Sequence, residues 1–385
     1  EESEEGASRQ IKHLTHVEDR PLQGGEKGFT HAHDSLMAAA DHIKKGKKTS
    51  ELTTKYDGSP AIVYGYHPKN KKFFVASKSA FNKNPKINYT QQDIEANHGH
   101  SPGLVSKLKD ALEHLPKVAP KQGVYQGDML FSGNDKKRKG AGISFNPNPS
   151  GITYTAHGTE ADRVKKAKVG VVTHLSYHGD EKNLNASHEV NHEKFAQHPD
   201  VWHQSAEHDT KHVHYDPMQQ LEYKKHLDAA KKIHKENGPM MYAATSPHQG
   251  DANHLATYIN QTVRTDDKPS VNGLMQHIYD KYAKASSSLK TPAAQSKKMS
   301  QGKEHVAYIN TNNKHYENLL NMHNHLQQAK NVLVNVLNQH SGGLEHDIDG
   351  KKTDPEGFVV NHAGQPTKLV NRAEFSKANL LKVRK

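Results

Sequence analysis

Residues 51–76 read ELTTKYDGSPAIVYGYHPKNKKFFVA and contain three short runs of β-branched and aromatic residues. The runs cover 51–56, 61–66 and 73–76, and they are separated by Asp-Gly-Ser-Pro and by Pro-Lys-Asn. Runs of this composition between turn-forming residues are typical of antiparallel strands. We therefore predict a β-meander here, with Lys55 near the end of its first strand.

Apolar periodicity predicts further elements on both sides of this meander. Helices are expected at 30–46, 103–115, 218–235, 274–285 and 316–337. Strands are expected at 123–131, 152–156, 169–175, 357–360 and 367–370, with a basic loop at 135–140. The expected fold class is α+β, an antiparallel body interrupted by a helical insertion. The predicted divisions are a tail at 1–26, a discontinuous body at 27–190 and 345–385, and an insertion at 191–344 that is a candidate nucleic-acid clamp.

The chain is basic: its 385 residues include 53 Lys and Arg against 42 Asp and Glu, a formal net charge of +11. This surplus favours a polyanionic partner, because neutralised phosphates release condensed counterions, although a merely basic surface is the alternative. Cysteine is absent, which excludes disulfides, thiolate zinc sites and cysteine nucleophiles. No apolar run approaches membrane-spanning length, so no membrane partner is expected. We expect a cytoplasmic monomer. The 31 histidines show no spacing typical of zinc ligands.

The sharpest local motif is Lys55-Tyr56-Asp57-Gly58, in which a strand lysine is followed at once by an Asp-Gly turn. A lysine amine can attack the α-phosphorus of a nucleotide and form a phosphoramidate, provided that the amine is neutral when it attacks. A short Lys-x-Asp-Gly match is weak by itself, because an ordinary hairpin turn has the same residues. The motif makes Lys55 a candidate nucleophile.

Two acidic segments strengthen this interpretation. Gln126-Gly127-Asp128 lies inside an apolar strand, and Glu356-Gly357 precedes another. Carboxylates that project from a sheet into one cleft can hold a divalent cation, which would offset phosphate charge. Lys368, in the next short strand, could hold the α-phosphate through the transition state. Taken singly, each of these residues is more often an ordinary surface group.

Taken in order, these segments resemble the motifs of the covalent nucleotidyltransferase superfamily, which includes DNA ligases, RNA ligases and messenger-RNA capping enzymes. The order is 55–58, Ser77-Lys78, 126–128, 169–177, 356–360 and Lys368. The chain looks closest to bacteriophage polynucleotide ligases, over roughly residues 11–180 and 345–380. The resemblance implies an antiparallel, ATP-grasp-like ligase domain, ATP as the nucleotide, Mg²⁺ or Mn²⁺ as the metal, and the cytoplasm of an infected host cell as the location.

The resemblance also implies roles for individual residues. Lys55 and Lys368 would be catalytic, and Asp128 and Glu356 would bind the metal. The nucleotide would contact residues from five separate segments: Thr54, Asp57, Gly58, Lys78, Asp128, His174, Tyr177 and Arg372. Of these, His174 and Tyr177 are alternative candidates for stacking on the base, and a core aromatic is the competing interpretation for both.

Several positions depart from the family pattern. Pro60 stands where many DNA ligases have an arginine, Gln126 where a carboxylate is frequent, and Val370 where a second lysine is common, a charge that Arg372 or Lys377 could supply. About 17 residues follow Lys368, so no oligonucleotide-binding barrel is expected after it. These departures leave the choice between DNA and RNA open.

The favoured function is an ATP-dependent ligase that seals 5′-phosphate and 3′-hydroxyl ends at nicks in duplex DNA or an RNA/DNA hybrid. A single-strand RNA repair ligase and a capping-type guanylyltransferase are the enzymatic alternatives. A non-catalytic nucleic-acid-binding phage protein is the third.

Overall fold

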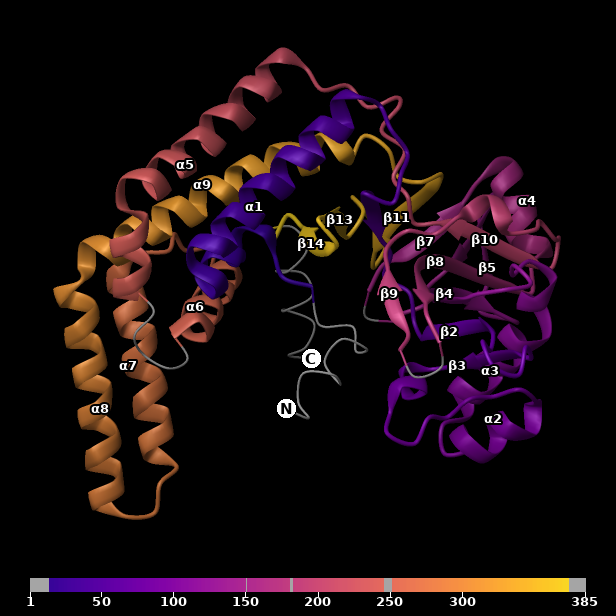
Figure 1. Cartoon of the computed structure of the whole chain (residues 1–385), viewed down its shortest axis with the longest axis horizontal. Helices are drawn as coiled ribbons and strands as arrows, with labels where there is room; N and C mark the ends of the chain where they lie inside the picture. The colour runs from indigo at the N-terminus through magenta and orange to yellow at the C-terminus, as the bar shows by residue number, and fades with distance from the viewer. Residues whose placement is uncertain (1–13, 150, 181–182, 246–250, 374–385) are drawn as a thin grey trace. The chain divides into compact units, whose positions relative to one another are not determined.

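The computed structural model describes residues 14–149, 151–180, 183–245 and 251–373 (Figure 1). By their internal contacts, the described residues form two units. The first comprises Leu14, His42–Val213 and Leu337–Pro366, and the second comprises 15–41, 214–336 and 367–373. The expected division placed 27–41 and 367–385 in the body and began the insertion at 191, whereas the second unit includes 15–41 and begins its long segment at 214. Residues 1–13 and 374–385, including Lys377, lie outside the described residues.

The largest sheet of the first unit has the strand order β10-β8-β4-β2-β3, and β9 also pairs with β8. Its strands are β2 (Ala61–Tyr66), β3 (Phe73–Ala76), β4 (Val124–Ser132), β8 (Val169–His178), β9 (Asn185–Ser187) and β10 (Val201–Ser205). The pairings are antiparallel except that of β8 with β10, which is parallel. Nearly every residue of the central β4 is buried, as expected for a strand with neighbours on both sides.

Helices cover this sheet and complete its core. They are α2 (Gln91–His98) and α3 (Pro102–His114), followed by the 3₁₀ turn η3 (Leu115–Lys117). Leu108, Ala111 and Leu115 are fully buried and belong to one apolar cluster with Ile62 and Val171 of the sheet. Leu108, Ala111 and Leu115 are three or four residues apart, so they share one side of the helix. This packing holds β2, β4 and β8 in place.

Two smaller sheets are each built from strands that are far apart in the sequence. One has the order β12-β11-β7-β6-β5, with β5 (Lys137–Lys139), β6 (Gly142–Phe145), β7 (Thr153–Ala156), β11 (Leu344–Ile348) and β12 (Lys351–Thr353). The other has the order β1-β13-β14, with β1 (Leu52–Lys55), β13 (Gly357–His362) and β14 (Gln365–Leu369). The helix α4 (Gly158–Lys166) follows β7. The pairing of β1 with β13 joins the candidate motifs at 55–58 and 356–360.

The second unit is helical. It contains most of α1 (Arg20–Lys44), then α5 (Pro217–Thr245), α6 (Asp251–Thr265), α7 (Val271–Ser287), α8 (Pro292–Thr311) and α9 (Asn313–Leu337). Charged side chains are enclosed among them: Lys330 of α9 hydrogen-bonds to Glu18 of the 3₁₀ turn η1 (Val17–Asp19) at 2.7 Å, and both are fully buried. His323 hydrogen-bonds to Asp19 at 2.8 Å. Within the described residues, no helix has both the length and the apolar character needed to cross a bilayer.

The mixed α+β class and the mainly antiparallel sheets are confirmed. The hairpin of the predicted meander is confirmed, because β2 and β3 have the predicted bounds and pair antiparallel. The strand β1 lies within 51–56, but it pairs with β13 in another sheet, so the three runs do not form one meander. Six strands were not predicted: β5, within the expected basic loop, and β6, β9, β10, β11 and β12. The expected helix at 30–46 begins earlier, at Arg20, with a non-helical residue at Gly25.

Candidate active site around Lys55

Lys55 is the last residue of β1, and the register of β1 with β13 places it opposite Gly357. Glu356 immediately precedes that glycine, so its side chain is brought next to Lys55. The Nζ of Lys55 donates a hydrogen bond to Oε1 of Glu356. The two side chains are 30% and 17% exposed. The other oxygen, Glu356 Oε2, is buried and has no hydrogen-bond partner among the described residues.

Asp57 is held by three residues from β7 and the loop before it. Its carboxylate accepts hydrogen bonds from the Ile152 N–H at 3.1 Å and from Nδ2 of Asn148 at 3.2 Å. Its own N–H donates to the hydroxyl of Tyr154 at 2.7 Å. Burial raises the pKa of Tyr154 well above its usual value, and the negative charges of Asp57 and Glu356 add to this rise. Tyr154 therefore lies close to both acids.

Gly58 allows the turn after Lys55 to pack directly on β4. A Cβ atom at position 58 would lie 2.5 Å from Cβ of Asp128 and 3.0 Å from the carbonyl oxygen of Met129. The pairing of β2 with β4 sets Ala61 opposite Asp128. Only glycine fits so close an approach. The same turn thus places Asp128 beside the Lys55-Tyr56-Asp57-Gly58 motif.

Asp128 has a partner of its own on the neighbouring strand. Oδ2 of Asp128 is 3.3 Å from Nε2 of His174 in β8, and both side chains are partly exposed. Asp128 and His174 therefore remain accessible to a ligand. The predicted residues Lys55, Asp57, Gly58, Asp128, His174 and Glu356 all belong to the first unit.

Tyr177, the second candidate for base stacking, is a core residue. Only 4% of it is exposed, and it belongs to an apolar cluster with Val63 and Phe74. Its hydroxyl donates a hydrogen bond to Oε1 of Gln126 at 2.6 Å, and its ring packs against Phe81. The structure therefore supports the core interpretation for Tyr177, whereas His174 lies beside Asp128.

Thr54 and Lys78 differ in exposure. Thr54 is buried, and its hydroxyl shares a hydrogen bond of 2.7 Å with Nδ1 of His208. The side chain of Thr54 is thus enclosed within the protein, where it supports β1. Lys78 is exposed at the start of the 3₁₀ turn η2 (Lys78–Phe81), directly after β3.

Lys368 and Arg372 belong to the second unit. The backbone N–H of Lys368 donates to the carbonyl of Thr15 at 3.0 Å. Arg372 is 1% exposed, and its guanidinium donates hydrogen bonds to both carboxylate oxygens of Asp19. The expected nucleotide contact through Arg372 is therefore corrected: its charge is used inside the protein, because two buried acids require a cation there.

No group of three or more His, Asp or Glu side chains in the described part of the chain is arranged to hold a metal ion. Asp128 faces His174, and Glu356 faces Lys55, so each predicted metal ligand already has a basic neighbour. Mg²⁺ is commonly held by only one or two carboxylates together with substrate phosphates. The unpartnered Oε2 of Glu356 fits that mode of binding.

Sequence reasoning missed the shell around Asp57. Tyr154 lies in a strand that was predicted, yet nothing in the local pattern of residues 152–156 indicates that its hydroxyl faces Asp57. Asn148 lies in a loop of mixed Asn, Pro and Ser residues, which is typical of any turn. Asn148 and Asp57 are 91 residues apart in the sequence, so no local pattern indicates their hydrogen bond.

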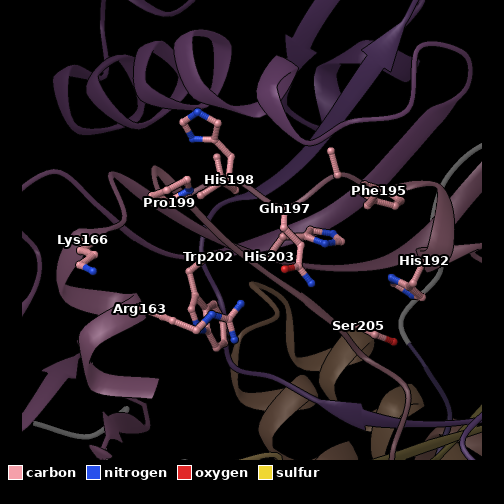
Figure 2. A pocket seen from close by; sticks show the side chains of 12 residues that line it. Arg163, Lys166, His192, Phe195, Gln197, His198, Pro199, Trp202, His203 and Ser205 are labelled. Carbon is pink, nitrogen blue, oxygen red and sulfur yellow. The ribbon is translucent and has the colours of Figure 1, made fainter. Parts of the chain in front are cut away.

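A separate cavity of about 450 Å³ in the first unit is shown in Figure 2. It is lined by α4 and by 192–205, with Arg163 and Lys166 as cations and Trp202 and Phe195 among the rings. The ring of Phe195 stacks on His203 at 4.3 Å, and burial lowers the pKa of His203 to about 3. Arg163 pairs with Glu160. None of the residues around Lys55 lines this cavity.

Comparison with known proteins places the chain in a family without assigning an activity. No curated protein and no solved structure matches it. One family model matches residues 11–384, nearly the whole sequence. The chain therefore belongs to the family of unknown function DUF6267.

Proposed function

We propose that the protein transfers AMP from ATP to Nζ of Lys55 and then uses this intermediate to join nucleic-acid ends. The observation that carries the proposal is the pairing of Lys55 with Glu356, next to a turn in which Asp57 is held by three residues and Gly58 packs on Asp128. A lysine fixed on a strand is suited to covalent nucleotidyl transfer when an adjacent base can take its proton.

In the first step, the Lys55 amine attacks the α-phosphorus of ATP. An N–P bond forms, the bond from phosphorus to the bridging oxygen breaks, and pyrophosphate leaves. Glu356 Oε1 already accepts a hydrogen bond from Nζ, so it is positioned to take the proton that the amine must lose. In the second step, a terminal 5′-phosphate oxygen attacks the AMP phosphorus, and the P–N bond breaks as Nζ regains a proton. In the third, a 3′-hydroxyl attacks the activated 5′-phosphate, and AMP leaves.

The remaining site residues would bind and orient the nucleotide. Asp57 would accept a hydrogen bond from the ribose or support Lys55, and His174 would stack on the base. Lys78, which is exposed, would contact phosphates. A divalent cation bound through Glu356 Oε2 or Asp128 would offset the charge of the departing pyrophosphate.

Self-adenylation tests the proposal directly. The full chain is incubated with α-labelled ATP and Mg²⁺ or Mn²⁺, denatured, and analysed for protein-bound label. Wild type should form an adduct and Lys55→Ala should not. Lys72→Ala, a matched change at an exposed lysine of the same unit, should behave as wild type. An adduct that persists in Lys55→Ala, or that never forms in wild type, contradicts the proposal.

The nucleotide and the acceptor separate ligation from its alternatives. Labelled GTP in place of ATP distinguishes guanylyl transfer, because a capping enzyme would form the adduct with GTP. A panel of nicked duplexes, with ribose or deoxyribose on either side of the nick, then tests sealing. Single-stranded RNA with a 5′-phosphate belongs in the same panel. We expect sealing of a duplex nick, and joining of single strands alone would contradict that choice.

A further inference from the structure

The positive charge of the helical region is concentrated at one place. Residues 217–337 contain 15 Lys and Arg and nine Asp and Glu. Six of the lysines, and none of the acids, lie in 281–303. The rest of 217–337 has nine basic and nine acidic residues, so it has no net charge. The six are Lys281, Lys284, Lys290, Lys297, Lys298 and Lys303. Residues 281–303 comprise the end of α7, the turn that follows and the start of α8. We call this segment the basic tip.

Close helix packing and hydrogen bonds fix the conformation of the basic tip. Helices α7 and α8 lie side by side (Figure 1), and a Cβ at Gly302 would be 2.7 Å from Cβ of Tyr282, so the helices approach closely there. In the turn, Ser286 Oγ donates to the carbonyl of Gln295 at 3.0 Å, and Gln295 Nε2 donates to the carbonyl of Leu289 at 2.9 Å. Thr291 caps the start of α8. These contacts fix the spacing of the lysines.

The lysines of the basic tip are available to a partner. Lys281, Lys284, Lys290, Lys297 and Lys303 are exposed, and Lys298 lies over the ring of Tyr282 at 5.4 Å. Lys281 and Lys284 are three residues apart and so lie on the same side of α7. Like charges held this close repel one another, and a bound polyanion would relieve that repulsion.

The composition of the tip favours a phosphate backbone over other anions. Exposed Ser296, Ser300 and Gln301 lie among the lysines, and such side chains commonly donate hydrogen bonds to phosphate oxygens. Tyr282 is the only aromatic residue in 281–303, and Gly302 and Lys298 cover it, so unpaired bases find no free stacking surface. Leu289 is the only large apolar side chain exposed in this segment, whereas a helix that binds a membrane surface needs an apolar face.

We propose that the basic tip of the α7–α8 hairpin binds the phosphate backbone of a nucleic-acid duplex. This inference rests on the proposed function for the identity of the polyanion. It goes beyond that function by naming the part of the chain that holds the duplex.

The test measures binding of a labelled nicked duplex to the full chain by anisotropy, over a salt range of roughly 50–300 mM. In Lys284/Lys290/Lys297→Gln, the affinity should fall about tenfold or more at the lowest salt, and the slope of log K against log salt should become shallower by about 2–3. Glutamine keeps the helix propensity and removes the charge. The matched control, Lys225/Lys231/Lys232→Gln on exposed positions of α5, should retain the wild-type slope.

Several outcomes would overturn the inference. An unchanged affinity and slope in the tip variant would do so, as would an equal loss in the α5 control, which would show that only net charge matters. A loss of binding confined to single strands, or to vesicles rich in anionic lipid, would assign the tip to another partner.

Failure of this inference and failure of the proposed function give different results. Self-adenylation needs no nucleic acid, so the tip variant should form the Lys55 adduct at the wild-type rate. A protein that binds through the tip and forms no adduct would contradict only the proposed activity.

Discussion

The side chains of Lys55 and Glu356 form a hydrogen-bonded ion pair although 301 residues separate them in the sequence. The pair exists because β1 and β13 are neighbours in one small sheet, with Lys55 opposite Gly357. The middle of the chain, including all of α5 to α9, lies between the two strands in sequence. Both partners nevertheless belong to the first unit.

Glu356→Gln should lower the rate of adduct formation at Lys55 by about a hundredfold, because a positioned proton acceptor is typically worth that much. The amide keeps the shape of the side chain but is a far weaker base. Labelled ATP and quenched time points measure the rate. Glu345→Gln, an exposed acid of the same unit, is the control and should adenylate normally. Wild-type rates in both variants would remove Glu356 from the mechanism.

Gly58→Ala should destabilise the first unit by about 1–3 kcal/mol, because the new Cβ would overlap Asp128 and the backbone of Met129. The single tryptophan of the chain, Trp202, is buried in this unit, so its fluorescence reports unfolding there. Gly103→Ala has open space around the added atom and should be neutral or stabilising by about 0.5–1 kcal/mol. Equal stability of the two variants would show that the turn does not pack on β4.

Local sequence patterns were sufficient for the β2–β3 hairpin and for much of α3, α5, α7 and α9, but not for α6 or α8. The runs 61–66 and 73–76 match β2 and β3 because β-branched and aromatic residues end at Pro and Gly turns. The first part of α1 was not predicted, since three glycines lie within 24–28 and Gly25 has non-helical backbone angles. β10 is short and pairs with β8 in parallel, and such pairing leaves no signal in the strand itself.

The candidate site could be predicted only in part. The motif at 55–58 is visible in the sequence, but its nearness to Glu356 followed from a resemblance and not from any spacing. The shell around Asp57 depends on contacts across about 90 residues, which single-sequence patterns do not contain. Arg372 was assigned from its charge alone, and its burial against Asp19 depends on how the second unit packs.

His346→Leu should stabilise the first unit and reduce its sensitivity to acid. His346 is 2% exposed, and neither ring nitrogen has a hydrogen-bond partner in the described part of the chain. Burial lowers its pKa from 6.5 to about 4, so between these values the unfolded chain binds a proton that the folded protein does not. Stability is therefore lost as the pH falls from about 6.5 to about 4.

The test compares urea unfolding by Trp202 fluorescence at pH 7.5 and pH 5, roughly either side of the ordinary histidine pKa. Leucine should add about 1–3 kcal/mol at the higher pH by removing unsatisfied buried atoms. The advantage should grow by on the order of 2 kcal/mol at the lower pH. His157→Leu, an exposed histidine of the same unit, should show no such growth. A constant difference at both values would contradict the assignment of acid sensitivity to His346.

Lys330→Met should destabilise the second unit by about 3–5 kcal/mol, because it leaves Glu18 buried without its nearest cation. Burial acts to raise the pKa of Glu18, and the charges of Lys330 and Arg372 outweigh it and lower that pKa to about 2. Far-UV circular dichroism in urea measures the unfolding of this largely helical unit. Lys224→Met breaks an exposed pair with Asp228 on α5 and should cost less than about 1 kcal/mol. Similar losses in both variants would mean that the buried cluster adds little.

His174 and Tyr177 were alternative candidates for stacking on the base, and their different surroundings allow a direct comparison. His174→Ala should raise the ATP concentration needed for half-maximal adduct formation by about fivefold or more, since stacking is worth about 1–3 kcal/mol per base. Tyr177→Phe should leave that concentration unchanged and lower stability by about 1–3 kcal/mol, because Gln126 loses the hydroxyl that donates to it. Tyr177→Ala would remove a core ring and could not separate binding from folding. Normal ATP dependence in His174→Ala, with a shifted dependence in Tyr177→Phe, would reverse the two roles and place the base against the apolar cluster around Val63.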